Sequence, residues 1–200
     1  MREYTAVLTD DTPDWGSVPI APIDNLLWTE RCEVTAYAQL CRTTDALRLR
    51  LRAEERNIRA EELPPLGMPC RDSCLEFFFC PEAGDDRYFN LEFSPSGCMY
   101  LGFGLNIREH SRLLVTDAGK IFCPEVSRSS GGWEVSYRVP FDFIRRFFPD
   151  FSVFPGKTMR ANFYKCGDAT VSPHYLAWNK ISCDSPAFHR PCDFGLVVFD

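Results

Sequence analysis

Hydrophobic and polar residues alternate along most of this chain. Residues 46–55, "ALRLRLRAEE", place Leu47, Leu49 and Leu51 on one side and three arginines on the other. A repeat of two residues is the period of a β-strand with one buried face. The preceding stretch 33–41, "EVTAYAQLC", has a similar pattern. The two segments therefore predict a hairpin joined through "RTTD".

Further alternating segments predict the rest of the sheet structure. A second hairpin is expected from 74–81 and 87–95, each closed by a proline, which cannot continue a strand ladder. Only 141–151, "FDFIRRFFPDF", suggests helix, and Pro140 and Pro149 limit it to one or two turns. Short alternating runs separated by turns predict an all-β, antiparallel, jelly-roll-like β-sandwich rather than a parallel α/β sheet. The remaining strands are expected at 97–105, 132–140, 157–166 and 194–200.

The length and charge of the chain indicate the number of domains and the kinds of partner to expect. Two hundred residues, 45% hydrophobic and 25% charged, suit one core, so a single domain over 1–200 is predicted. The formal net charge is −6 and the 22 Lys and Arg form no basic block, which disfavours nucleic acid as a partner. The N-terminal residues lack the apolar core of a signal peptide, and no apolar run approaches the roughly 20 residues of a membrane span. We therefore expect a cytoplasmic protein without a membrane partner. The sequence does not determine its oligomeric state.

The chain contains ten cysteines, which in a reducing compartment are expected to stay reduced. Cys70, Cys74 and Cys80 are separated by four and six positions, unlike the two-residue knuckle of structural zinc sites. Buried thiols are therefore favoured over a metal site, and metal ligands are left unassigned. Cys166 could become a nucleophile only if His174 or His189 lay beside it in space, which sequence spacing does not decide.

Two glutamates occupy otherwise apolar strands. Glu76 alternates with flanking phenylalanines, and Tyr88, Asn90 and Glu92 share one side of the following strand. If the phenylalanines point into the core, the two strands present a joint polar surface. That surface is either a solvated outer face, a hydrogen-bonding array for sugar hydroxyls, or the acid–base pair of a glycosidase.

The segment 167–193 is long, turn-rich and stocked with aromatic residues and histidines. Loops of this length are often functional. His174 and His189 are each expected to be hydrogen-bonded structural residues, whereas His110 lies in a polar stretch and is expected to face solvent. Trp178 is read first as a core or loop anchor and second as a platform for a sugar ring.

The order of these motifs resembles carbohydrate-binding module family 9 and its stand-alone relatives. The resemblance runs from about residue 28 to the end and is most specific in "ANFYKCGD", "PHYLAWNKI" and "FHRPCDFGLVVF". It implies a β-sandwich that binds a mono- or oligosaccharide without catalysis, with no catalytic residues and no cofactor. It also allows structural calcium held by loop carboxylates and carbonyls, without assigning the ligands.

The resemblance also implies a set of ligand-binding residues. Family modules clamp a terminal sugar between two tryptophans. The first clamp position, six residues before Glu76, is Cys70 here, so that wall lacks its aromatic side chain and Met68 is the nearest apolar substitute. We expect Glu76, Asn90 and Glu92 to bind hydroxyls, Tyr164 and His174 to form walls, and Trp178 with Phe188 or His189 to form the apolar platform.

Two alternative functions stay open at this point. One is a hydrolase acting on a glycan or small ester, through Glu76 and Glu92 or through Cys166 with a loop histidine. The other is a sandwich that holds haem or a metal instead of a sugar.

Overall fold

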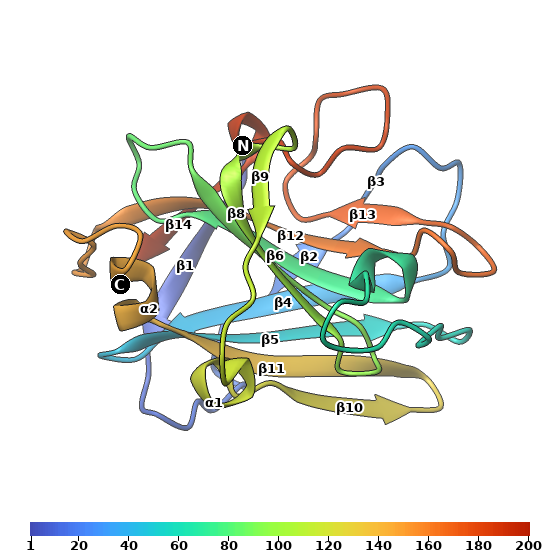
Figure 1. Cartoon of the computed structure of the whole chain (residues 1–200), viewed down its shortest axis with the longest axis horizontal. Helices are drawn as coiled ribbons and strands as arrows, with labels where there is room; N and C mark the ends of the chain where they lie inside the picture. Colours follow the sequence, from blue (N-terminus) through green and yellow to red (C-terminus); the bar gives the residue numbers. More distant parts are fainter.

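Fourteen strands, two short α-helices and two short 3₁₀ turns make up the computed structural model, which describes all 200 residues (Figure 1). The elements are β1 (Glu3–Leu8), β2 (Ala21–Ile23), β3 (Asn25–Leu26), β4 (Thr35–Arg42), β5 (Ala46–Glu54), η1 (Pro69–Arg71), β6 (Cys74–Cys80), β7 (Tyr88–Phe93), β8 (Met99–Asn106), β9 (Glu109–Arg112), α1 (Ala118–Phe122), β10 (Glu125–Ser129), β11 (Gly132–Pro140), α2 (Phe141–Arg145), β12 (Thr158–Cys166), β13 (Tyr175–Ala177), η2 (Pro191–Asp193) and β14 (Gly195–Phe199).

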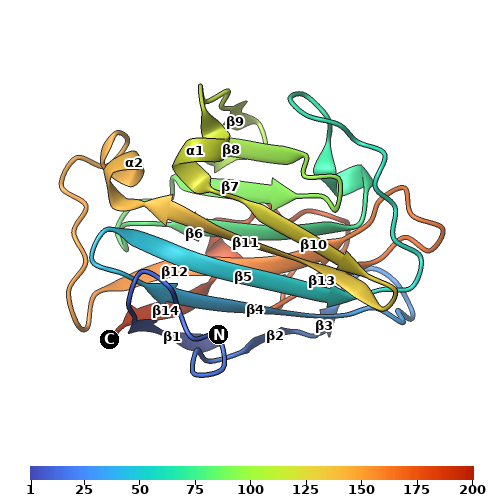
Figure 2. The same ribbon diagram turned by 90° about the horizontal axis from the view of Figure 1, so that it is seen from below.

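The strands form two layers joined through β1. The hydrogen-bonded order is β10-β11-β5-β4-β1-β14-β12-β6-β7-β8-β9. Figure 2 shows β4, β5, β11 and β10 in one layer, with β12, β6 and β7 in the other. The all-β sandwich prediction is confirmed, but the sheet is mixed, because β1 pairs in parallel with β14 and then with β4. The alternation of residues within a strand does not indicate which strand it pairs with. The parallel pairing of β1 with β14, almost 200 residues away, was therefore not predicted from the sequence.

The core lies between the two layers and follows the predicted alternation. Leu75, Phe77 and Phe79 of β6 all point into the main core cluster. The Phe77 ring stacks on Phe79 at a centroid distance of 4.8 Å and on Phe163 of β12 at 5.1 Å. Because side chains of a strand alternate, the intervening residues of these strands must lie on the opposite side of the layer.

Several elements were not predicted from the pattern, and most of them are short or lie at sheet edges. They are β1, β2, β3, β9, β10, β13 and α1. The predicted helix is present but ends at Arg145. Within the long loop, β13 pairs with both β12 and β3, which ties residues 175–177 to the sheet. None of the helices is long and apolar enough to cross a membrane.

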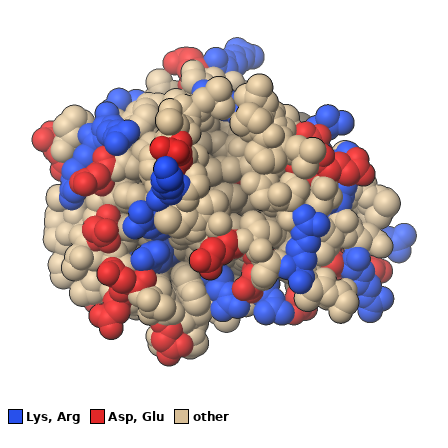
Figure 3. Space-filling view, turned by 60° about the horizontal axis from the view of Figure 1, so that its bottom comes forward, with Lys and Arg blue, Asp and Glu red and all other residues tan.

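Charged side chains of both signs decorate the surface. On the face in Figure 3, lysines and arginines are interspersed with aspartates and glutamates. Among the ion pairs of the molecule are Arg50 with Glu134 at 2.8 Å and Arg160 with Asp86 at 2.6 Å. That face therefore presents no continuous basic strip of the kind that tracks a phosphate backbone.

Candidate functional site

The side of β6, β7 and β12 that points away from the main core carries a row of polar residues. We call this row the polar face; it consists of Glu76, Asn90, Glu92, Tyr164 and Cys166. Glu76 lies directly opposite Glu92 on β7 and opposite Tyr164 on β12. Directly paired residues have Cβ atoms about 4.5–5.5 Å apart, so the three strands bring these side chains into mutual contact.

The polar face is buried. Glu76 is 2% exposed, Glu92 6% and Asn90 fully buried, so the solvated-face interpretation of the sequence is wrong. Part of the cover is a smaller apolar cluster that includes Phe78 and Phe194. Burying a carboxyl group is costly unless it is protonated or hydrogen-bonded, so the partners of these groups decide their state.

A chain of hydrogen bonds runs along the polar face. The Asn90 Nδ2 donates to Glu92 Oε1 at 2.8 Å. The Asn90 Oδ1 can only accept, so the 2.8 Å contact to His110 Nε2 places a proton on that nitrogen. The Cys166 thiol donates to Glu76 Oε1 at 2.9 Å. Glu92 Oε2 is buried and has no hydrogen-bond partner in the protein.

Burial also sets the protonation of the two glutamates. It raises the pKa of Glu76 to about 7, against the opposing effect of the Cys166 hydrogen bond. Burial raises the pKa of Glu92 well above its usual range, and the negative charge of Glu76 raises it further. The shift favours the neutral form of Glu92, and a neutral carboxyl group can both donate and accept a hydrogen bond.

Aromatic residues of the long loop form one wall beside the polar face. The Phe188 ring stacks on Tyr164 at a centroid distance of 4.1 Å and an interplanar angle of 6°. Trp28 lies 5.6 Å from Phe188. His189 Nδ1 and the Tyr88 hydroxyl are hydrogen-bonded at 2.6 Å. The loop thus brings both residues expected at the second clamp position to this face. Trp28, from the segment after β3, joins them, although the sequence had assigned it no role.

The opposite wall comes from β8 and β9. The Arg112 guanidinium lies 4.7 Å over the Tyr100 ring. It also donates to the carbonyl oxygens of Pro65, Leu66 and Gly67 at 3.0, 2.9 and 2.9 Å. These bonds hold the segment that leads to Met68 beside the face, and the Arg112 Nη1 contacts the Met68 sulfur at 3.8 Å.

Sequence reasoning missed this second wall because β9 reads as a polar loop. Its histidine, His110, was expected to face solvent, but it is half-buried, bonded to Asn90, and stacked 5.5 Å from Tyr88. The available signal was Gly102, which faces Asn90 across the β7–β8 pair. A Cβ atom there would lie 2.0 Å from the His110 ring, so only glycine lets the ring reach across.

Two expected site residues lie elsewhere. Trp178 is 2% exposed and packs edge-on against Phe163 at 5.7 Å and Tyr4 at 6.4 Å in the main core. Trp178 is therefore a core anchor, and the expectation that it forms part of the apolar platform for a sugar is wrong. His174 accepts a hydrogen bond at Nε2 from Lys165 Nζ, 2.7 Å away. Lys165 alternates with Tyr164 along β12, so His174 belongs to the other side of the layer and forms no wall of the polar face.

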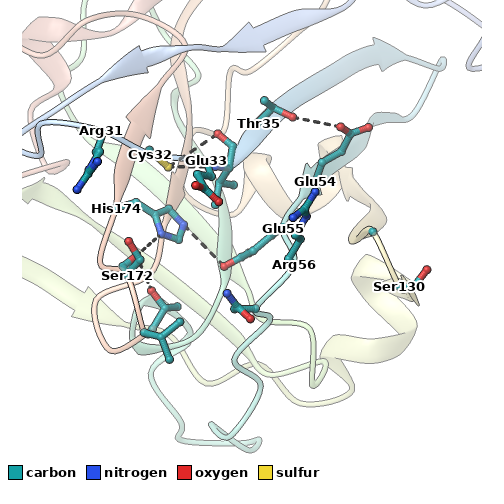
Figure 4. A pocket seen from close by; sticks show the side chains of 15 residues that line it. Arg31, Cys32, Glu33, Thr35, Glu54, Glu55, Arg56, Ser130, Ser172 and His174 are labelled. Carbon is teal, nitrogen blue, oxygen red and sulfur yellow. Dashed lines mark hydrogen bonds and ion pairs between the residues drawn. The ribbon is translucent and has the colours of Figure 1, made fainter.

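His174 instead borders a separate cavity of about 940 Å³ at one end of the sandwich (Figure 4). Figure 4 shows its ring facing Glu55, with 3.9 Å between Nε2 and Oε1. Charged residues of both signs line this cavity, including Arg31, Glu33 and Arg56. It does not share its lining with the polar face.

Thiol catalysis with a loop histidine is not supported by this geometry. The Cys166 thiol is bonded to Glu76, whereas the two candidate histidines bond to Lys165 and to Tyr88. Burial also raises the pKa of the Cys166 thiol well above its usual range. Because the thiolate is the reactive form, this cysteine is a poor nucleophile.

The burial of His189 predicts a pH dependence of stability. Burial, with a smaller contribution from the charge of His110, lowers the pKa of His189 from 6.5 to about 4. Between these pH values the unfolded chain binds more protons, so the contribution of neutral His189 is complete above pH 6.5 and is lost as the pH falls toward 4. As the pH falls from 6.5 to 4, we expect the free energy of unfolding of His189→Gln to decrease less than that of the wild type. The difference between the two decreases should be up to about 3 kcal/mol.

The measurement is urea unfolding of the wild type and His189→Gln at a series of pH values. Only the difference between the two proteins is informative, because Glu76 and Glu92, with raised pKa values, favour the folded state at low pH. Parallel curves for the two proteins would show that His189 does not titrate in this way.

Comparisons with known proteins agree with the fold and the motifs. The family model described as carbohydrate-binding family 9 matches residues 9–199. A candidate carbohydrate-binding protein from Bacteroides uniformis is 27% identical, with a TM-score of 0.83 over 100% of this chain and 99% of that one. A search of curated proteins found no match.

Two more distant structures show the same fold. A family 9 module from Caldicellulosiruptor kristjanssonii, in complex with cellotriose, has a TM-score of 0.63 at 12% identity, over 99% of this chain and 93% of that one. The same organism's family 9 module in complex with glucose gives 0.62 at 11% identity, over 100% and 96%.

Proposed function

Because the chain belongs to carbohydrate-binding family 9, we propose that its polar face binds a mono- or oligosaccharide without cleaving it. The family 9 structures that share the fold were obtained with cellotriose and with glucose, both built from glucose units. In this chain the proposed contacts are Glu76, Asn90 and Glu92 for the hydroxyls and Tyr164 with Phe188 and His189 for the walls.

The observation that carries the proposal is the row of buried polar groups ending in Glu92 Oε2. A buried polar atom without a partner is destabilising, typically by about 1–3 kcal/mol, unless a ligand or solvent satisfies it. Sugar hydroxyls both donate and accept, which matches the carboxyl oxygens of Glu92 beside the Asn90 amide. This array thus offers the paired donors and acceptors that a sugar ring requires.

The walls limit the affinity. The Phe188 ring, supported by Tyr164 and Trp28, offers an apolar surface on one side. On the other side Cys70 occupies the clamp position, so stacking is available from one direction only. We expect dissociation constants in the micromolar to millimolar range, corresponding to about −8 to −4 kcal/mol.

The test is ligand-detected NMR or calorimetry with glucose, xylose, cellobiose and xylobiose. The wild type is expected to bind at least one of them saturably. Asn90→Ala removes the donor to Glu92 and the acceptor for His110, so we expect at least a 10-fold loss of affinity, or about 1.4 kcal/mol.

Glu125→Gln serves as the matched control, since Glu125 is exposed on β10 of the other layer. It should bind like the wild type. Absence of any saturable binding at tens of millimolar sugar would refute the proposal, and equal losses in both variants would place the sugar elsewhere.

The cellular location is part of the same proposal. All ten cysteines are unpaired, including the exposed Cys123 and Cys192. Unpaired surface thiols suit a reducing compartment, so we place the protein in the cytoplasm. Fractionation of cells that express the full chain would test this, and recovery outside the cytoplasm would contradict it.

A further inference from the structure

Cys74, Glu76 and Cys166 form a compact cluster of metal-binding atoms at one end of the polar face. Cys74 of β6 and Cys166 of β12 are direct cross-strand partners, and Glu76 follows two residues after Cys74 on the same side. Their two sulfur atoms and one carboxylate oxygen all lie within 4.8 Å of one another. Cys166 Sγ and Glu76 Oε1 are 2.9 Å apart.

These distances are close to those of a tetrahedral zinc site. Zinc binds thiolate at about 2.3 Å and carboxylate oxygen at about 2.0–2.2 Å, which places neighbouring ligand atoms roughly 3.5–3.8 Å apart. Side-chain shifts of about 1 Å would convert the present cluster into that geometry. Two adjacent strands fix the three positions, so the backbone has no need to move.

The donor chemistry selects the class of metal. Thiolates are soft ligands that favour zinc and related ions, whereas calcium and magnesium require oxygen donors. This cluster therefore does not fit the structural calcium that the family resemblance allows. A divalent ion would also offset the charge of the deprotonated ligands in a buried setting, where unpaired charges are costly.

The cluster has one partly exposed side, occupied by Cys70 and Asp168. The Cys70 carbonyl oxygen is 3.7 Å from Cys166 Sγ and accepts the Asp168 backbone N–H at 2.9 Å. Cys70 is half-buried and Asp168 is exposed, so an ion could enter from this direction. A fourth coordination position would face the same side.

We propose that Cys74, Glu76 and Cys166 form a binding site for zinc or a similarly soft divalent ion. This site is not needed for the proposed sugar binding, although the two share Glu76. Binding the ion displaces the protons of both thiols, together with the proton of Glu76 in those molecules where the carboxyl is protonated, and these protons pass to the buffer.

The test titrates Cd²⁺ and Zn²⁺ into the full chain, with Cys123→Ser and Cys192→Ser in every sample to remove the exposed thiols. We expect one ion per chain, an ultraviolet cadmium–thiolate charge-transfer band, and proton release measured by calorimetry in two buffers. Cys74→Ser with Cys166→Ser should lower the affinity at least about 100-fold, because even loss of an outer-shell partner costs 10–100-fold.

Cys80→Ser is the matched control. Cys80 is a fully buried thiol on the same strand and side, but it is six residues from Cys74, about 20 Å away. It should leave metal binding unchanged. Circular dichroism and thermal unfolding establish that each variant is folded, and the charge-transfer band of the Cys123→Ser, Cys192→Ser protein tests the site even if the double serine variant does not fold.

Two results would overturn the proposal: no thiolate band at stoichiometric Cd²⁺ in the Cys123→Ser, Cys192→Ser protein, or an equal loss of metal affinity in the Cys80→Ser control. Sugar titration of the metal-free and zinc-loaded protein separates the two proposals. Sugar binding without metal binding refutes only the zinc site, and metal binding without sugar binding refutes only the proposed function.

Discussion

Replacing Lys165 with methionine is expected to lower the free energy of unfolding by about 3–5 kcal/mol. Lys165 is fully buried, and its ammonium group is bonded to the Cys166 carbonyl at 2.8 Å and to His174 at 2.7 Å. It also lies 3.1 Å from Glu55 Oε2. Methionine removes the positive charge and leaves the buried Glu55 carboxylate without its cation, which costs more than the pair itself contributes.

The measurement is urea unfolding of the purified variant. The double variant Lys165→Met, Glu55→Gln removes the unpaired charge and should recover at least half of the loss. Lys120→Met is the surface control, because Lys120 is exposed and its pair with Asp117 spans 3.4 Å, so little change is expected. A loss below about 1 kcal/mol in Lys165→Met would mean that this buried pair is not important for stability.

Replacing Trp178 with alanine is expected to destabilise the protein by about 3–5 kcal/mol without changing its affinity for sugar. The indole packs against Phe163 and Tyr4 in the core. Gly195 lies beneath it, where an added Cβ would come within 2.4 Å of the ring. Truncation would open a cavity that this closely packed surrounding cannot refill.

Phe188→Ala is the variant to compare with Trp178→Ala, because the two should differ in both stability and sugar affinity. The Phe188 side chain is only partly buried and lies on the wall of the polar face, so we expect a smaller loss of stability but weaker sugar binding. Unfolding by urea and sugar titration are measured on both variants. If Trp178→Ala folds with wild-type stability and loses sugar binding, Trp178 is a platform after all and the core assignment is wrong.

The main strands were predictable because alternation is a local signal. Residues 132–140 are β11 as expected, and β5, β6, β7 and β12 differ from their predicted ranges by one or two residues at an end. The opposite orientation of Phe77 and Glu76 also follows from the pattern alone. Strand geometry fixes which side each residue occupies, so the polar row itself was visible in the sequence.

The surroundings of that row were not predictable. Alternation places Glu76 and Glu92 on a common side but does not say whether that side meets water or is covered. The loop carrying Phe188 and His189, together with β9 carrying His110, covers it through contacts between residues 20 to more than 100 positions apart. Burial raises the pKa of both glutamates, and the charge of Glu76 on the neighbouring strand adds to the shift of Glu92.

The sequence by itself determined the sandwich class, the side of each strand that faces the core, and the motifs of carbohydrate-binding family 9. Only the tertiary structure showed that Trp178 and His174 lie away from the polar face. It also showed that Cys166 lies opposite Cys74 and bonds to Glu76, not to a histidine. The physical reason is that side-chain orientation follows from local backbone geometry, whereas neighbours are set by strand register and loop packing. Those depend on the whole chain.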